Sequence, residues 1–317
     1  MKRFLLSCAV ATALLMSGCG STGAPVSIDF PFFFLQDVDC NEVPDACTFL
    51  DDAGSAIACV GSSLYFLDYS QGYVLNCVDL GAHLSCCAAS SEGGYAAAAS
   101  GVQLFYVSEG TYVVHTPVLL SAPAEFMLTK PYGTVIYVVC TDGSVSTVST
   151  VGNWYEISNT DTSVDSPGAA AIDEDGSALY VFDSADSTVK KLSTSGFELL
   201  AEQEVQCPVA DICTAPGGGV FVAPYELYEA WHISRSSGLR DYSVPLPGRP
   251  ECLAATSDGA YLYVVLAGAG IAVVDMDGEV EAQTGSYGQP SDVAVSGSGQ
   301  RALFCCPDIM KLIMVSR

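Results

Sequence analysis

Residues 250–285 alternate short apolar runs with polar turns, and this pattern predicts four consecutive β-strands. Apolar runs at 253–255, 261–266 and 271–274 are separated by a Ser257-Asp258-Gly259 turn and a small-residue loop. A further turn at Asp277-Gly278 leads into the fourth run. Glycine suits these turns because it adopts positive φ without steric cost. The stretch therefore predicts a four-stranded antiparallel meander.

Versions of this meander recur along the chain. Glycines mark the predicted turn between the first two strands at a spacing of about 41 residues, which is typical of β-propeller blades. They are Gly54, Gly94, Gly133, Gly176, Gly218, Gly259 and Gly299. A second series marks the turn between strands three and four: Gly72, Gly110, Gly152, Gly196, Gly238 and Gly278. We therefore predict an all-β fold, a seven-bladed β-propeller of four-stranded antiparallel blades.

The last blade lacks room for a fourth strand before the chain ends at Arg317. An apolar segment at 24–35 precedes the first blade and belongs to no predicted strand of it. We expect this N-terminal segment to join the last blade and close the ring, because closure removes exposed sheet edges. Pro31 within the segment suits an outer edge strand. One propeller domain would then span 24–317.

The first 18 residues have the layout of an export signal. Lys2 and Arg3 form a basic start, residues 4–16 an apolar run, and Gly18 precedes Cys19. The run is too short for a transmembrane helix. Residues 15–19 resemble the bacterial lipobox, in which the cysteine becomes the lipidated first residue. This resemblance implies acyl chains on Cys19, residues 19–23 as a short tether, and anchoring at the bacterial cell envelope, at the outer membrane in a Gram-negative source. An ordinary secretory signal with a chance cysteine is the alternative.

The formal net charge of −25 limits the kinds of partner that the chain is expected to bind. Such a chain repels phosphate backbones, so we expect no nucleic-acid binding. The acidic turns at 173–176 and 275–278 lack the ligand spacing of calcium loops. We expect no bound metal or cofactor from these patterns.

Apart from Cys8 and Cys19, the chain has 12 cysteines, and an even number in an exported chain is compatible with disulfides. Cys47 and Cys59 lie symmetrically about a predicted turn, and Cys207 and Cys213 enclose a short loop. We take these two pairs as candidate disulfides. The alternative is that the cysteines are small, buried core residues.

No catalytic motif stands out in the sequence. The three histidines fall in different predicted blades, and no Gly-x-Ser-x-Gly, His-Glu-x-x-His or phosphate-loop pattern occurs. The longest predicted loop between second and third strands lies in blade five. It provides a candidate binding loop, because long loops often carry function. Its residues are Tyr225, Glu226, Tyr228, Trp231 and His232. Packing of these aromatic side chains onto their own blade is the simpler alternative.

Blade six carries Ser257-Asp258-Gly259, residues 262–264 (Leu-Tyr-Val) and residues 273–275 (Val-Val-Asp), and blade four repeats the Asp-Gly and Leu-Tyr-Val elements. This pattern resembles the YVTN-type propeller repeats of exported bacterial and archaeal proteins. The resemblance implies a β-propeller fold. That group includes lactonases, quinoprotein enzymes and non-enzymatic surface proteins, so it does not settle activity.

Two functions follow as hypotheses. The first is a lipid-anchored, non-enzymatic binding or assembly scaffold at the cell envelope, with an envelope protein or a small molecule as its partner. The second is a lactonase-like hydrolase or a redox or cofactor-binding enzyme that uses the mouth of the axial channel. The tight predicted loops favour the first.

Overall fold

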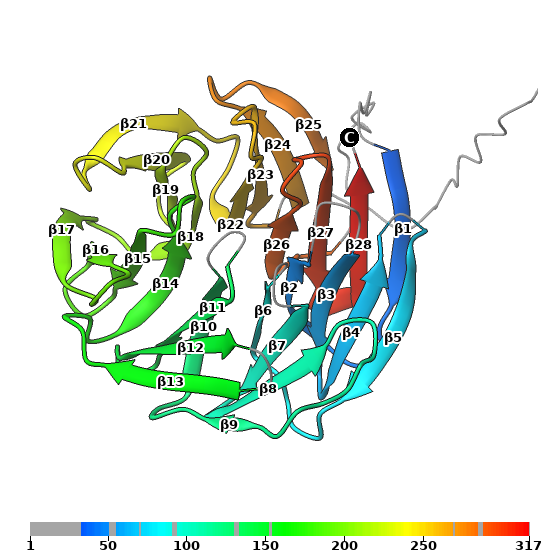
Figure 1. Cartoon of the computed structure of the whole chain (residues 1–317). Coiled ribbons are helices and arrows are strands. Elements are labelled where there is room, and N and C mark those ends of the chain that lie inside the picture. Colours follow the sequence, from blue (N-terminus) through cyan, green and yellow to red (C-terminus); the bar gives the residue numbers. More distant parts are fainter. Residues whose placement is uncertain are drawn as a thin grey trace, which may run out of the picture.

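The computed structural model describes residues 33–316, except for 51–54, 70, 91–93, 130–132, 152–153, 269 and 285–287. Seven four-stranded antiparallel sheets form a closed ring, which confirms the predicted seven-bladed propeller (Figure 1). Within the described part of the chain, no helix has the length and hydropathy needed to cross a membrane.

Each blade contributes strands in the same order from the axis outward. The inner strands of blades 1 to 7 are β2 (Pro44–Phe49), β6 (Cys86–Ser90), β10 (Ala124–Thr129), β14 (Pro167–Ile172), β18 (Val209–Thr214), β22 (Pro250–Ala255) and β26 (Asp292–Val295). The second strands are β3 (Ser55–Val60), β7 (Tyr95–Ser100), β11 (Val135–Cys140), β15 (Ala178–Asp183), β19 (Gly219–Pro224), β23 (Tyr261–Leu266) and β27 (Arg301–Cys306). The third strands are β4 (Ser63–Asp68), β8 (Gln103–Ser108), β12 (Val145–Val151), β16 (Thr188–Ser193), β20 (Glu229–Ser234), β24 (Gly270–Asp275) and β28 (Lys311–Ser316). The outer strands are β5 (Tyr73–Asp79), β9 (Val118–Leu119), β13 (Trp154–Thr160), β17 (Leu199–Glu204), β21 (Arg240–Pro245) and β25 (Val280–Thr284), and β1 (Phe33–Asp39) completes blade 7. A short 3₁₀ turn, η1 (Pro307–Ile309), precedes β28.

Predicted turn glycines such as Gly176, Gly259 and Gly299 adopt the positive φ that their turns require. Gly278 has φ +85°, and a Cβ placed there would lie 2.7 Å from Pro245 Cδ in the neighbouring blade. A side chain at this position would therefore meet both backbone strain and a clash. The turn at Gly196 differs, because the adjacent Phe197 takes the left-handed conformation instead (φ 55°).

The ring closes through the N-terminal strand, as predicted. β1 pairs antiparallel with β28, which is the third strand of the last blade. The described bounds of β1 are Phe33–Asp39, so it overlaps the predicted segment 24–35 at residues 33–35 and continues four residues beyond it. Residues 24–32, including Pro31, lie outside the described residues. Lys311 at the start of β28 forms ion pairs with Asp37 and Asp39, and Val38 between them is buried, so alternation sets the register.

The core consists of apolar layers between neighbouring blades. Strands buried on both faces read as continuous apolar runs, which accounts for the weak alternation in the sequence. In five blades the inner strand has a register shift near its first residues, for example between Pro44 and Ala46 and between Pro250 and Cys252. A bulge of this kind redirects the side chain of the extra residue.

Candidate functional site

The inner strands of all seven blades surround an axial channel of about 540 Å³. The antiparallel order of each blade places three features at one end of this channel. They are the starts of the inner strands, the turns between second and third strands, and the connections between blades. We call this end the mouth.

The mouth carries carboxylates at one repeated position. Asp45, Glu125 and Glu251 are the extra residues of the inner-strand bulges in blades 1, 3 and 6. One carboxylate oxygen of Asp45 is buried without a hydrogen-bond partner, and His83 Nε2 lies 3.6 Å from it. Burial raises the pKa of Asp45, and the nearby His83 opposes that rise. The Gln289 amide donates a hydrogen bond to Glu251.

Deeper in the channel, two aspartates connect neighbouring inner strands. Asp211 of β18 accepts a hydrogen bond from the backbone N–H of Leu253 in the next blade (2.9 Å). Asp292 of β26 accepts the equivalent bond from Cys47 (2.8 Å). Each carboxylate also accepts the N–H of its own following residue. These bonds use N–H groups that the edge of an inner strand leaves free.

Burial raises the pKa of both aspartates. The pKa of Asp211 rises to about 7, and the charge of Asp292 adds to the effect of burial. The pKa of Asp292 rises to about 6, because burial outweighs the N–H donors that stabilise the carboxylate. Two carboxyl groups with raised pKa values therefore line one channel.

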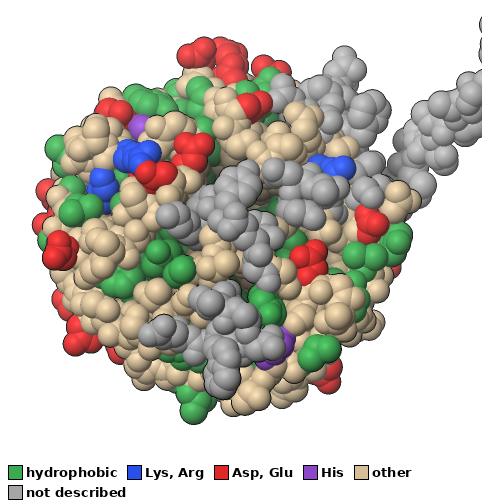
Figure 2. Space-filling model, viewed as in Figure 1, with side chains coloured by type: hydrophobic (Ala, Val, Ile, Leu, Met, Phe, Trp, Pro, Cys, Tyr) green, Lys and Arg blue, Asp and Glu red, His purple; other side chains and the backbone are tan. Residues whose placement is uncertain are grey.

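The channel has no cationic lining among the described residues that form its wall. Four carboxylates contribute to that wall, from Asp45, Glu125, Asp211 and Asp292. Acidic side chains are also scattered over the rim of the face that Figure 2 shows. A wall of this charge repels anionic ligands.

Part of the predicted binding loop lies at the mouth. Tyr225, Glu226 and Tyr228 follow β19 in a turn, and Tyr228 is 65% exposed. The Arg249 guanidinium lies over the Tyr225 ring, 4.4 Å from its centroid, and so holds that ring against the blade connection. Tyr228 is therefore the aromatic residue of this loop that is most open to a partner.

Trp231 and His232 belong to β20 rather than to a loop. Trp231 is buried against blade 4, and its Nε1–H donates to Glu229 (2.6 Å). His232 is buried on the opposite face, where its ring stacks on Tyr242 and its Nδ1 lies 2.7 Å from Asp241. The loop is shorter than the sequence suggested, because the third strand already begins at Glu229.

The four cysteines of the predicted disulfides are free thiols in the structure. The register pairs Cys47 with Ala58 and Cys59 with Ala46, so the two thiols lie on opposite faces of blade 1. This register is one residue away from the symmetric one that the pairing assumed. Cys207 and Cys213 likewise pack into different layers, on the blade 4 and blade 6 sides of blade 5.

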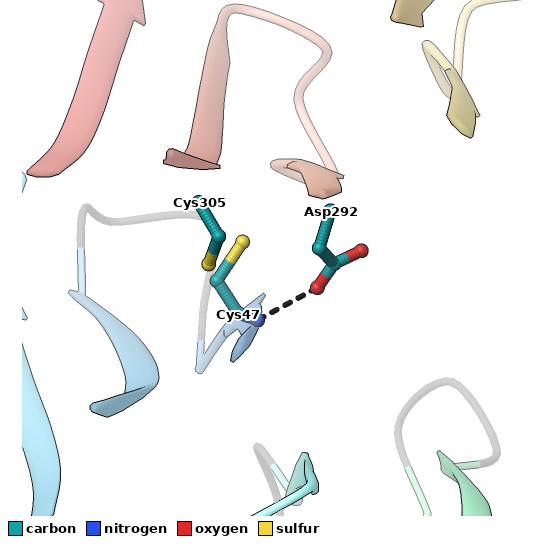
Figure 3. A group of neighbouring side chains, drawn as sticks. All are labelled: Cys47, Asp292 and Cys305. Atoms are coloured by element: carbon teal, nitrogen blue, oxygen red, sulfur yellow. Dashed lines mark hydrogen bonds between the residues drawn. The ribbon is translucent and has the colours of Figure 1, made fainter. Parts of the chain in front are cut away.

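Contacts between blades bring other cysteines together. The thiols of Cys47 and Cys305 are neighbours across the ring closure (Figure 3). Cys59 and Cys87 are neighbours in the same way, between blades 1 and 2. Neither these pairs nor the role of Asp211 and Asp292 was predicted from the sequence. An alignment of the blades strand by strand could have indicated the cysteine pairs, because each one joins the same two repeat positions.

Cys19, the predicted lipidation site, lies outside the described residues. Comparison with models of protein families and with curated proteins finds no match for this chain. The fold and the geometry of the channel are thus the basis for a functional hypothesis.

Proposed function

We propose that this chain is an exported bacterial lipoprotein that serves as a non-enzymatic binding or assembly scaffold at the cell envelope. In this proposal residues 1–18 are removed as a signal peptide, and acyl chains on Cys19 hold the propeller at the membrane. The lipobox-like residues 15–19 support the anchor. The Leu-Tyr-Val and Asp-Gly pattern of blades four and six supports a YVTN-type repeat.

The observation that carries the scaffold proposal is the convergence at the mouth. The starts of the inner strands that line the channel, the blade connections and the exposed Tyr228 lie at the same end of a closed ring. A rigid ring presents such an end without reorganisation, which lowers the entropic cost of binding. We therefore place the partner, an envelope protein or a small molecule, at the mouth.

A second candidate function rests on the raised pKa values of Asp211 and Asp292. Carboxyl groups with pKa values near neutrality are often found in active sites, where one can act as a general acid or base. A lactonase-like hydrolase would use them at the channel. The hydrogen bonds that both carboxylates accept from neighbouring blades favour a structural role, and we therefore prefer the scaffold.

Two measurements test the anchor. Mass spectrometry of the detergent-purified protein should find Cys19 as an acylated first residue, and Cys19→Ala should move the protein out of the membrane fraction. A chain that keeps residues 1–18, or that stays membrane-bound after Cys19→Ala, would overturn the anchor.

To test whether the partner binds at the mouth, a photo-crosslinking amino acid is placed at Tyr228 and, as the matched control, at Ser236. Ser236 is exposed in a turn between third and fourth strands, at the opposite end of the ring. The scaffold proposal expects a discrete crosslinked product from position 228 and none from position 236. Equal labelling from both positions, or none from position 228, would contradict it.

A further inference from the structure

Cys47, Asp292 and Cys305 converge at the junction where the last blade meets the first (Figure 3). One Sγ from each cysteine and one carboxylate oxygen all lie within 4.8 Å of one another. Cys305 is fully buried, Cys47 is 8% exposed, and Cys47 and Asp292 both line the axial channel. The group is therefore nearly closed on one side and open to the channel on the other.

The fold holds these side chains in place. Asp292 of β26 and Cys305 of β27 are direct cross-strand partners within blade 7. Cys47 comes from β2 of blade 1, and its N–H bonds to Asp292 Oδ2 at 2.8 Å. The Cys47 thiol also lies 3.4 Å from the Leu303 carbonyl, which limits its rotation. Two blades thus supply one small donor set.

From this donor set we propose that Cys47, Asp292 and Cys305 form a Zn²⁺ site at the ring closure. Zn²⁺ binds thiolate at about 2.3 Å and carboxylate oxygen at about 2.0–2.2 Å, so its ligand atoms lie roughly 3.3–3.8 Å apart in a tetrahedron. The observed spacing needs only small side-chain rotations to reach this geometry. A mixed sulfur and oxygen set suits Zn²⁺ better than the softer Cu⁺. Water from the channel completes the fourth position.

The repeat provides two internal comparisons. Between blades 1 and 2, Cys59 and Cys87 form the same thiol pair, and Ala46 replaces the aspartate. Between blades 5 and 6, Asp211 makes the same bond to the next blade, and its neighbours are Ala223 and Leu253.

The thiol pair occurs without the carboxylate in one interface, and the carboxylate occurs without the thiols in another. Neither feature needs the other for packing. Among these three interfaces, only the ring closure combines them, which is what a metal site requires. A bound ion there would link the first blade to the last.

The test uses full-length protein purified with a thiol reductant, stripped with a chelator, reloaded with ZnSO₄ and desalted. Elemental analysis should give one zinc per chain in the wild type. Cys47→Ser, Cys305→Ser and Asp292→Asn should each weaken zinc affinity by at least about 10-fold, measured by competition with a chromophoric chelator. Cys87→Ser is the matched control and should keep wild-type affinity. Circular dichroism verifies that each variant is folded.

Cobalt gives a second readout that does not depend on stability. Co²⁺ bound by the wild type should show a thiolate-to-cobalt charge-transfer band that weakens per bound ion in Cys47→Ser, where only the Cys305 thiolate remains, and keeps its intensity in Cys87→Ser. The proposal is overturned if the wild type retains no stoichiometric zinc, or if Cys87→Ser weakens binding as much as Cys47→Ser. It is also overturned if protein isolated without reductant contains a Cys47–Cys305 disulfide that reforms in place of metal binding.

Discussion

Asp211 accepts a hydrogen bond from the backbone N–H of Leu253, which belongs to the next blade of the ring and lies 2.9 Å away. Two blades further on, Asp292 makes the same bond to Cys47, although 245 residues separate that pair in the sequence. One carboxylate position of the inner strand thus joins neighbouring blades at two interfaces, including the one where the chain closes on itself.

The first prediction concerns the stability that this bond provides. Asp211→Ala removes the acceptor and leaves the inner-strand N–H groups of Leu253 and Ile212 without it. We expect a loss of about 1–3 kcal/mol in the free energy of unfolding, because an unsatisfied N–H keeps its desolvation cost. Urea unfolding measures this loss of stability. Asp277→Ala, at an exposed turn, should change the free energy by less than about 0.5 kcal/mol.

The second prediction follows from the raised pKa of Asp211. The folded chain holds this proton up to about pH 7, whereas the unfolded chain releases it near the ordinary value of 3.8. Between these values the folded state binds more protons, so the contribution of Asp211 to stability falls as pH rises. Asp211→Asn should remove this slope. The difference between wild-type and variant unfolding free energies should therefore change across this range and become constant below it. A difference that is independent of pH would contradict a raised pKa.

The third prediction concerns a buried ion pair in blade 4. The Lys190 ammonium lies 2.7 Å from Asp183, whose side chain is fully buried, and 2.8 Å from the half-exposed Asp186. Burial acts to raise the pKa of Asp183, yet hydrogen bonds from Lys190 and from backbone N–H groups keep it below its usual value. Lys190→Met would leave this carboxylate buried without its counter-ion.

We expect Lys190→Met to destabilise the chain by about 3–5 kcal/mol, because an unpaired buried charge is strongly unfavourable. Thermal unfolding at neutral pH measures the effect. Asp186→Asn removes only the exposed partner and should cost at most about 1 kcal/mol. The Lys190→Met defect should shrink as pH falls and Asp183 becomes protonated. Equal losses of stability in the two variants would argue against the pair with Asp183 as the main contribution of Lys190 to stability.

Much of the fold could be predicted from the sequence because turn residues repeat in phase. Gly259 and Gly278 mark two turns of blade six, and both have positive φ. The closing strand was predicted as an element, but it runs past the predicted end at residue 35 to Asp39. The ion pair of Lys311 with Asp37, which helps to fix its register, joins residues 274 positions apart. Pairings of this kind leave no local pattern in a sequence.

The candidate site could be predicted only in part. The prediction that Cys47 faces Cys59 depended on the exact strand register, which the length of one turn sets. A shift of one residue moves a side chain to the opposite face of the strand. The contact between Cys47 and Cys305 depends on how two blades pack, so the spacing of residues within one blade does not predict it. Both thiols nevertheless occupy positions that recur in the next interface, where Cys87 meets Cys59.

This recurrence leads to the last prediction, which assumes the zinc site proposed at the ring closure. Ala46 occupies the position of Asp292 one blade on, since it pairs with Cys59 as Asp292 pairs with Cys305. Ala46→Asp should therefore complete a second donor set with Cys59 and Cys87, and the zinc content should rise from one to two ions per chain. Ala46 lines the channel, so the new carboxylate has access to water and need not be fully buried.

The control is Ala46→Asn, which has nearly the same shape but a much poorer metal ligand, and its zinc content should stay at one. Combining Ala46→Asp with Cys87→Ser should return the content to one as well, because the new site then loses a thiolate. If a folded Ala46→Asp variant still bound a single ion, two thiols and a carboxylate in this geometry would not suffice for zinc. The assignment of the same donor set at the ring closure would then lose its main support.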